Sequence, residues 1–349
     1  MRNSIPDTAL KKEAMLYRSS GAATLSCFLC SHRCAIRPGG VGLCGVRTHQ
    51  DGRLYTLVYD KVIAAHVDPI EKKPLHHFLP GSFSFSVATV GCNFHCFHCQ
   101  NHDIAQIPKT RGTASSLPGH PVSPEDIVNS AARNGCKSIA YTYTEPTIYF
   151  ELAYDTARLA HERGIKNVFV TNGYMTEEAL ETIQPYLDAA NVDLKGYCDS
   201  TYRTVCGGRL EPVKESIQRM VQLGIWVEVT TLVIPMHNES ETELREIAKF
   251  LKGVSPEIPW HVSAFHPHYK FTHLPATSSA SIARAVVLGK EAGLKYVYSG
   301  NIFEKRSTNT YCPSCGKLLI HRSGFHLLEN QLMDGKCPLC STKIGGIFS

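Results

Sequence analysis

The sequence predicts an α/β protein whose main domain is a partial (βα)6 TIM-like barrel, flanked by a small Cys-rich N-terminal module and a C-terminal zinc-ribbon-like module. Strand-like and helix-like segments alternate between residues 83 and 300, which is typical of a parallel sheet. About six or seven such units are too few for a closed barrel of eight. Cysteines gather before and after this region, so the predicted domains are 1–82, 83–300 and 301–349.

The predicted strands are runs rich in β-branched and aromatic residues. They cover residues 83–90, 138–144, 167–172, 191–195, 226–234 and 261–265. Helices are expected to begin after Ser123, an N-cap followed by proline and acidic residues, and after Ser240, which forms a capping box with Glu243. Gly164 and Gly224 stand where two helices should end. A doubly wound open sheet is the alternative fold, but no glycine-rich dinucleotide-binding turn follows the first strand.

The composition is that of an ordinary globular protein, with 43% hydrophobic and 19% charged residues among 349. The N-terminus lacks the apolar segment of a signal peptide, and no stretch reaches the roughly 18 apolar residues of a membrane span. We therefore expect a cytoplasmic protein with no membrane partner. The formal charge of +5 ignores thiolates bound to metal, and no basic run stands out, so a nucleic-acid partner is not expected.

The chain has fourteen cysteines, and most of them stand in clusters. Because no secretory signal is visible, metal binding is favoured over a disulfide framework. Three cysteines lie apart from the clusters, and we expect them to be buried, unligated thiols, since free cysteine packs as a small apolar side chain. These are Cys136, Cys198 and Cys206.

A C-x3-C-x2-C motif follows the first predicted strand and consists of Cys92, Cys96 and Cys99. Three thiolates fit a [4Fe–4S] cluster in which one iron has no cysteine ligand, and that iron is where a cofactor or substrate can bind. The alternative is a structural zinc site that uses the three cysteines and one histidine of the same loop, namely His95, His98 or His102.

Two further cysteine sets lie outside the predicted barrel. Two C-x2-C knuckles with 21 residues between them predict a structural zinc ribbon, with an auxiliary iron–sulfur cluster as the alternative. They are formed by Cys312, Cys315, Cys337 and Cys340. The N-terminal set allows zinc, a second iron–sulfur cluster or unligated thiols, with His32 as an additional possible ligand. It comprises Cys27, Cys30, Cys34 and Cys44.

The central motif, with the aromatic Phe97 two residues before its last cysteine, resembles the signature of radical S-adenosylmethionine (SAM) enzymes. The resemblance implies an oxygen-sensitive [4Fe–4S] cluster on Cys92, Cys96 and Cys99 that binds SAM through its open iron. It also implies reductive cleavage of SAM to methionine and a 5′-deoxyadenosyl radical, which abstracts hydrogen from a substrate. The reductant is expected to be an electron donor such as flavodoxin or ferredoxin.

Later strand ends resemble the SAM-binding pattern of this family. Glu145 would contact the SAM amino group, and Asn172 would face the ribose. Asp193 and Lys195 are similar to the Asp-x-Lys of pyruvate formate-lyase activating enzymes, and would bind the ribose hydroxyls and the SAM carboxylate. Further expected cofactor-binding residues are Phe97, Val233, beside the adenine, and His266.

Each of these assignments has a purely structural alternative. Glu145 is also suited to the first turn of a helix, and Asp193 and Lys195 are suited to pairing with each other on a solvated rim. Thr144 stands where many members of the family carry glycine, which leaves the backbone conformation next to Glu145 open.

Nearly the whole chain from about residue 20 resembles the radical SAM component of the AmmeMemoRadiSam system. The similar segments include CFLCSHRCAIRPGGVGLCGVR, EKKPLHHFLPGS, GCNFHCFHCQN, YTYTEPT and the two C-terminal knuckles. The resemblance implies Memo-like and AMMECR-like protein partners and a small-molecule or protein substrate.

The alternatives are an activating enzyme for a glycyl-radical protein and a non-catalytic metal-binding module that docks partners. If the chain is an enzyme, something must close the mouth of the barrel against water and oxygen. Residues 21–47 and 311–349 are the candidates, because both flank the barrel region.

Overall fold

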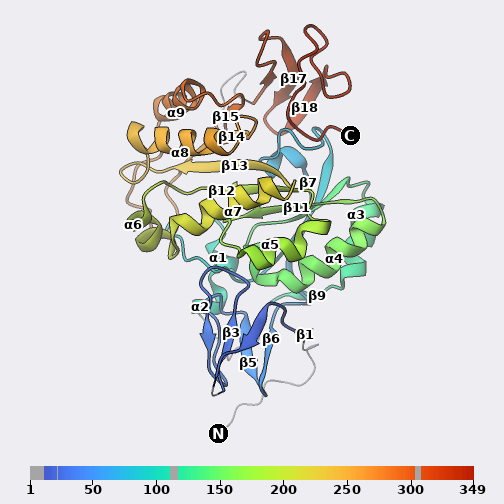
Figure 1. The fold of residues 1–349 in the computed structure, drawn as a ribbon, viewed down its shortest axis with the longest axis vertical. Coiled ribbons are helices and arrows are strands. Elements are labelled where there is room, and N and C mark those ends of the chain that lie inside the picture. Colours follow the sequence, from blue (N-terminus) through green and yellow to red (C-terminus); the bar gives the residue numbers. More distant parts are fainter. Residues whose placement is uncertain (1–11, 22, 111–116, 303–307) are drawn as a thin grey trace.

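A nine-stranded sheet forms the centre of the protein in this computed structural model, which describes residues 12–21, 23–110, 117–302 and 308–349 (Figure 1). The strand order is β15-β14-β13-β12-β11-β10-β8-β7-β9. The bounds are β7 (Lys61–Pro69), β8 (Phe83–Thr89), β9 (His120–Pro121), β10 (Ser138–Tyr141), β11 (Lys166–Thr171), β12 (Ala189–Asp193), β13 (Trp226–Val233), β14 (Trp260–Ala264) and β15 (Val297–Ser299).

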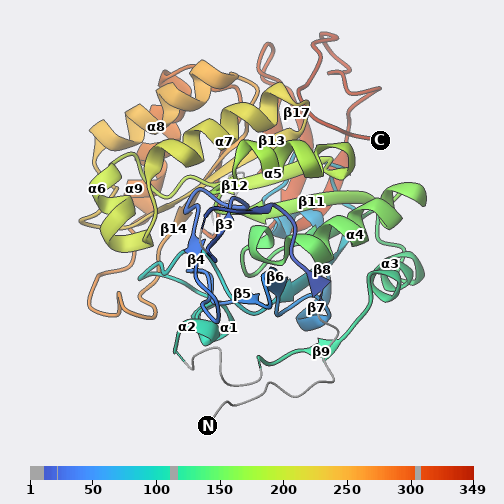
Figure 2. The same cartoon turned by 60° about the horizontal axis from the view of Figure 1, so that its bottom comes forward.

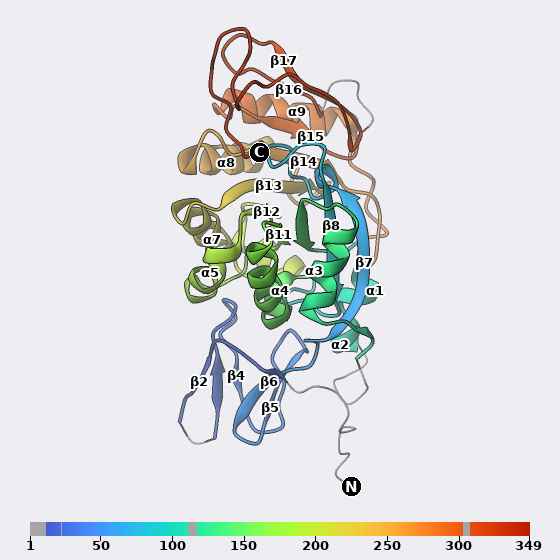
Figure 3. The same cartoon turned by 90° about the vertical axis from the view of Figure 1, so that its right-hand side faces the viewer.

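From β8 to β15, omitting β9, neighbouring strands are parallel and follow chain order. Right-handed crossovers then place successive helices on one face, and α4, α5, α7 and α8 lie along the same side of the strands (Figures 1 and 3). The helices are α3 (Pro124–Arg133), α4 (Phe150–Glu162), α5 (Glu177–Ile183), α7 (Leu210–Gln222), α8 (Glu241–Val254) and α9 (Ser279–Glu291). The α/β class is confirmed, and this winding differs from the doubly wound alternative, whose strand order reverses.

The packing follows from the sequence pattern. In α7 the buried residues include Val213, Ile217 and Met220, which share one face at helical spacing. The parallel strands are buried almost throughout, as expected for strands covered on both faces. Each fully buried apolar side chain of this size contributes about 1.5–3 kcal/mol.

The helix boundaries largely agree with the predictions. Ser123 forms a complete capping box with Asp126, and Gly164 and Gly224 adopt φ values of 69° and 78° just beyond α4 and α7. Ser240 caps α8 by accepting a hydrogen bond from the Glu243 amide. The second half of the predicted capping box is wrong, because the Glu243 carboxylate accepts the amide N–H of Tyr197 instead.

All six predicted strands are present, but β7, β9 and β15 of the nine-stranded sheet were not predicted. β7 runs antiparallel to β8, and its apolar residues lie at buried, half-buried and exposed positions without alternation, so its sequence has no clear period. β15 has only three residues. The predicted strand 138–144 ends at Tyr141, three residues early.

Two small modules lie at opposite ends of the sheet (Figures 1 and 3). The N-terminal module has two three-stranded sheets, and the C-terminal module has one. Their strands are β1 (Lys12–Glu13), β2 (Tyr17–Ser19), β3 (Leu25–Cys27), β4 (Ala35–Ile36), β5 (Arg47–Gln50), β6 (Arg53–Thr56), β16 (Thr310–Tyr311), β17 (Leu318–Ser323) and β18 (His326–Asn330). A buried ion pair between Arg47 and Glu151 joins the N-terminal module to α4.

The C-terminal module binds the end of the central sheet where the parallel strands begin. Arg322 donates a 2.6 Å hydrogen bond to the carbonyl of His76, and Phe78 pairs with Ile347. Phe78 in turn packs against Val168, within the strands. The expectation that residues 311–349 cover the barrel mouth is therefore wrong, because the loops that follow the strands lie at the other end, beside residues 21–47 (Figure 2).

Among the described residues, no helix is long and apolar enough to cross a lipid bilayer.

Candidate active site

The loop that follows β8 carries the central cysteine motif and begins at Gly91. This glycine has φ 109°, and a Cβ there would lie 2.8 Å from the Val46 side chain and 3.4 Å from the carbonyl oxygen of Cys44. Only glycine fits this conformation and this close approach. Gly91 therefore seats the cysteine loop directly against the N-terminal module.

The structure places Cys92, Cys96 and Cys99 on this single loop, with Cys96 buried and the other two half-buried. The amide of Phe94 donates to Cys92 Sγ at 3.3 Å, a contact that also suits a metal-bound thiolate. Burial raises the pKa of the Cys99 thiol to about 11 and that of Cys92 further, so a bound metal must displace these protons. The chemistry of this donor set fits an iron–sulfur cluster.

The three sulfur atoms do not converge as the ligands of a single ion would. Among the described residues, just two sets of possible ligands have all their donor atoms within 4.8 Å of one another, and neither contains all three cysteines. A [4Fe–4S] cube holds its thiolates on separate irons, so a wider spread is expected for it. The arrangement favours the cluster over a zinc site on these cysteines.

One of those two sets was not predicted. It comprises Cys96, His98 and Cys206, all buried. Of the three isolated cysteines, Cys136 and Cys206 are buried as expected. The prediction is wrong for Cys198, which is exposed because it stands in the loop before the short helix α6 (Asp199–Thr201). The one sequence signal that could have indicated a role for Cys206 is the Gly207–Gly208 pair that follows it, because paired glycines often mark a close approach of the backbone to another segment.

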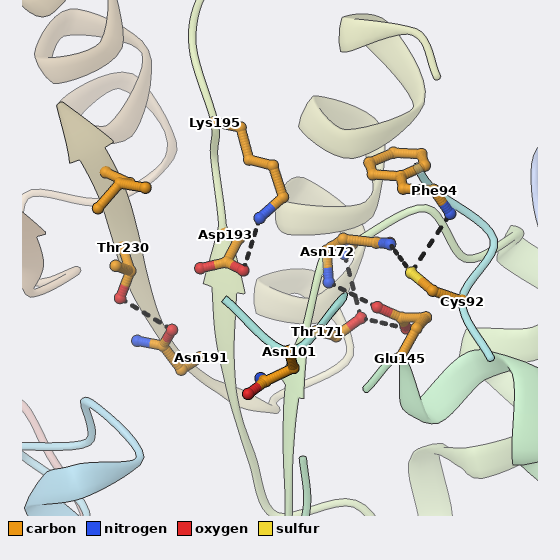
Figure 4. A network of polar contacts seen from close by, with 12 residues as sticks. Cys92, Phe94, Asn101, Glu145, Thr171, Asn172, Asn191, Asp193, Lys195 and Thr230 are labelled. Carbon is orange, nitrogen blue, oxygen red and sulfur yellow. Dashed lines mark hydrogen bonds and ion pairs between the residues drawn. The ribbon is translucent and has the colours of Figure 1, made fainter. Parts of the chain in front are cut away.

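Glu145 lies at the end of the segment after β10 and is fully enclosed (Figure 4). Its carboxylate accepts hydrogen bonds from the amides of Thr147 at 3.1 Å and Asn172 at 2.8 Å, and from the Thr171 hydroxyl at 2.7 Å. It caps the short helix η2 (Pro146–Tyr149), so the helix-start alternative describes its local geometry. Burial raises the pKa of this carboxyl, and the donors oppose that rise.

The backbone conformation next to Glu145 shows how threonine is accommodated at position 144, where many radical SAM enzymes carry glycine. The left-handed residue is Tyr143, with φ 64°, and not Thr144. Tyr143 is held by its carbonyl, which accepts a 2.7 Å bond from the Asn101 side chain, and by its hydroxyl, which donates to Asp68. A non-glycine residue in this conformation is strained, and these contacts hold it there.

Asn172 follows β11 directly and connects that strand to the cysteine loop. Its side-chain Nδ2 donates to Asn93 Oδ1 at 2.7 Å and lies 3.9 Å from Cys92 Sγ. Its side-chain oxygen accepts the amide of Tyr174. The structure thus brings Asn172, Glu145 and Cys92 together (Figure 4).

Asp193 is the last residue of β12 and forms a 2.8 Å ion pair with Lys195, two residues beyond it, which is the alternative that their sequence positions allowed. The Lys195 side chain is 15% exposed and that of Asp193 is 36% exposed, so the pair is partly open. Burial opposes the charge on Lys195, but the Asp193 carboxylate and nearby thiols outweigh it and raise its pKa. On the adjacent strand Thr230 donates to Asn191 at 2.9 Å (Figure 4).

The remaining predicted residues surround the same end of the sheet. Phe97 is half-buried, makes an edge contact with Phe271 and carries the Lys270 ammonium 4.8 Å from its ring centre. Val233 is fully buried at the end of β13, whereas His266 is exposed in the loop after β14.

The two outer cysteine sets differ in geometry. In the C-terminal module all four sulfur atoms lie within 4.8 Å of one another, with Sγ–Sγ distances of 3.5 Å for Cys312–Cys340 and 3.7 Å for Cys315–Cys337. In the N-terminal module Arg47 donates to Cys27 Sγ at 3.3 Å, and burial raises the pKa of Cys44 to about 11.

His32 was expected as a possible extra ligand of the N-terminal set. Its Nε2 instead lies 2.9 Å from the carbonyl oxygen of Asn93, and its ring packs against Tyr174. Lys109 also binds the cysteine loop, through a 2.7 Å bond to the Phe94 carbonyl. Both contacts secure the cysteine loop. The sequence did not predict this role for His32 or Lys109.

Comparison with known proteins places this site in a family. Residues 86–251 match the model of the radical SAM superfamily. An uncharacterized protein of Methanocaldococcus jannaschii is 43% identical over 336 residues, covering 95% of this chain and 98% of the relative.

Two more distant relatives carry descriptions of activity. A probable GTP 3′,8-cyclase of Methanococcus vannielii is 24% identical over 74% of this chain and 89% of its own length. A putative glycyl-radical enzyme activating enzyme of Methanocaldococcus jannaschii is 23% identical over 62% of this chain and 79% of its own length.

Proposed function

This chain belongs to the radical SAM superfamily, and we propose that it cleaves SAM at a [4Fe–4S] cluster held by Cys92, Cys96 and Cys99. The single observation that carries the proposal is the position of these three thiols. They lie on one loop at the carboxyl end of β8, beside Glu145 and Asn172, which follow the next two parallel strands, β10 and β11. Chemistry at the carboxyl ends of parallel strands is the rule for barrel-like folds, and we interpret residues 83–300 as a partial barrel.

A cluster held by these cysteines would supply the one electron needed to cleave SAM to methionine and a 5′-deoxyadenosyl radical for hydrogen abstraction. The chain's own residues bind and orient SAM. Lys195 keeps its positive charge because its pKa is raised, so it is suited to the SAM carboxylate, and Asp193 to the ribose hydroxyls. Glu145 Oε2 accepts one bond from the Asn172 amide and retains a lone pair for the SAM ammonium group.

Other contacts are assigned by position. We propose that Asn172 faces the ribose, that Val233 borders the adenine and that Phe97 and His266 complete the wall of the site. The N-terminal module lies against the cysteine loop through Gly91 and His32, and we propose that it helps to exclude water from this end of the barrel.

The two outer cysteine sets are proposed to be structural or auxiliary metal sites. The four sulfur atoms of Cys312, Cys315, Cys337 and Cys340 converge as around a single ion, which supports zinc. The N-terminal set of Cys27, Cys30, Cys34 and Cys44 is proposed to bind either zinc or a second iron–sulfur cluster.

The substrate is proposed to be a small molecule or a protein, with a flavodoxin- or ferredoxin-like electron donor in the cytoplasm. Memo-like and AMMECR-like proteins are the proposed partners, on the strength of the sequence resemblance. A second candidate is activation of a glycyl-radical enzyme. It is favoured by the Asp193-x-Lys195 motif and by the relative described as a putative activating enzyme.

The test is SAM cleavage by protein reconstituted anaerobically with iron and sulfide. With dithionite, the wild type should form 5′-deoxyadenosine, and the variant in which Cys92, Cys96 and Cys99 are all changed to Ala should form none. Changing Cys136, a buried cysteine outside the site, to Ala should leave the product unchanged. Equal product from the triple variant would refute the assignment.

A further inference from the structure

Cys96 converges with two metal-type ligands, His98 on the cysteine loop and Cys206 in a distant segment, that have no role in the proposed reaction. The sulfur atoms of Cys96 and Cys206 and a ring nitrogen of His98 all lie within 4.8 Å of one another. Cys206 is 110 positions from Cys96 along the chain, and all three residues are buried. Convergence of this kind also characterises the C-terminal cysteines, but not the complete set of Cys92, Cys96 and Cys99.

His98 provides a second, independent observation. The residue is 5% exposed, and neither of its ring nitrogens has a hydrogen-bond partner among the described residues. Burying an imidazole without partners is unfavourable, and such a group calls for a specific explanation. A metal ion between His98 and the two thiols would satisfy one of these nitrogens.

The set is held in place by the backbone. The amides of His95 and Phe97 donate to the carbonyls of Cys206 and Val205 at 2.9 Å and 3.0 Å. A Cβ at Gly207 would come within 2.1 Å of the His95 ring, and one at Gly208 within 2.3 Å of the Phe94 ring. The segment that carries Cys206 is therefore fitted to the cysteine loop.

We propose that Cys96, His98 and Cys206 bind one zinc ion when the iron–sulfur cluster is absent. Two thiolates and one imidazole with an open fourth position are an established ligand set for zinc. Binding would release the two thiol protons to solvent, leaving a Zn²⁺–dithiolate site with no net charge. The nearby Lys195 ammonium remains paired with Asp193.

Because Cys96 belongs to both sets, the zinc ion and the cluster exclude each other. The exclusion rests on the proposed function, in which Cys96 is a cluster ligand, whereas the zinc site itself does not. The zinc form would be an inactive state that keeps Cys96 and Cys206 from oxidation until iron and sulfide are supplied.

The test uses the full chain, stripped of metal under anaerobic, reducing conditions and then titrated with Zn²⁺, or with Co²⁺ as a coloured substitute. Cys206→Ala should bind one ion fewer per chain than the wild type, and His98→Ala should do the same. Cys99→Ala should bind as many as the wild type. The outer cysteine sets are intact in every variant, so they cancel in the comparison, and circular dichroism verifies folding.

A competition experiment then addresses exclusion. Zinc loaded beforehand should slow cluster assembly in the wild type and have little effect on Cys206→Ala, which should still assemble the cluster. Equal zinc binding by the wild type and Cys206→Ala would overturn the proposal, as would loss of an ion from Cys99→Ala. If the wild type formed no cluster at all, the proposed function would fail, while the zinc comparison would still decide the site.

Discussion

The cysteine loop after β8 and the C-terminal module both present thiols for metal, at opposite ends of the same sheet, but their surroundings differ. In the C-terminal module four sulfur atoms converge, Cys315 and Cys340 are exposed, and a small apolar cluster lies beneath. In the loop the sulfur atoms are spread, and the carboxylate of Glu145 and the amide of Asn172 lie close to them. Convergent thiols above an apolar cluster suit a structural ion, whereas spread thiols beside a buried carboxylate and a side-chain amide suit a reactive centre.

Among the changes that test this difference, Cys337→Ser is expected to have the largest effect, which is the unfolding of the C-terminal module. The C-terminal module has a core of only a few side chains, so a bound metal must contribute much of its stability. Residues 311–349 should then exchange amide hydrogens as if unfolded, while the visible absorbance of the cluster persists. The matched control is Cys136→Ala, which should leave exchange in this module unchanged.

The distinction between the two cysteine sites would be wrong if Cys337→Ser abolished the cluster, or if the C-terminal cysteines of the purified protein bound iron in place of zinc. Either result would mean that the C-terminal cysteines take part in the iron chemistry and are not a separate structural site.

Acid should loosen the end of the sheet where the C-terminal module binds. His77 contacts the Gly345 carbonyl and the Tyr298 hydroxyl, each at 2.6 Å, and its burial lowers its pKa from 6.5 to about 4. The unfolded chain therefore binds a proton between these values and the folded chain does not. The contribution of neutral His77 to the free energy of unfolding is fully present above about pH 6.5. It falls toward pH 4, by about 3 kcal/mol at most.

The measurement is the free energy of unfolding against pH for the wild type and His77→Gln. The variant should be less stable at neutral pH. Its free energy of unfolding should also fall less between pH 6.5 and pH 4, because the contribution of His77 is missing. A matched change at the exposed His66 should leave the profile as it is in the wild type. Identical slopes for the wild type and His77→Gln would show that His77 does not couple this end to acid.

The smallest expected effect is on SAM affinity in Glu145→Gln. The substitution keeps the size of the side chain but removes the charge-assisted hydrogen bond that we propose Glu145 makes to the SAM ammonium group. Such a loss costs about 1.5–3 kcal/mol, or roughly 10- to 150-fold in Kd. The cluster spectrum should remain, because Glu145 is not a ligand.

Isothermal titration with SAM gives the affinity, and Glu162→Gln, at the exposed end of α4, is the control. Unchanged affinity in Glu145→Gln would leave this residue with the capping of η2 as its role, and would weaken the contrast drawn between the two cysteine sites.

The extent to which sequence predicted this protein depends on whether the relevant contacts are local. The cysteine spacing after β8, the N-cap at Ser123 and the terminating glycines each act within a few residues, and the structure agrees with them. The capping box at Ser240 failed because Glu243 found a partner in another loop. The strand β7 and the three-residue strand β15 were missed because their pairing, and not their own pattern, defines them.

The sequence by itself determined the α/β class, the chain order of the parallel strands, the family and the three cysteine sets, because spacing and hydrophobic pattern are properties of neighbouring residues. Only the tertiary structure decided which module lies at which end of the sheet, that Tyr143 is the strained residue, and that Cys206 meets Cys96 and His98. These are contacts between segments far apart in the chain, and they arise from packing surfaces that no short stretch of sequence records.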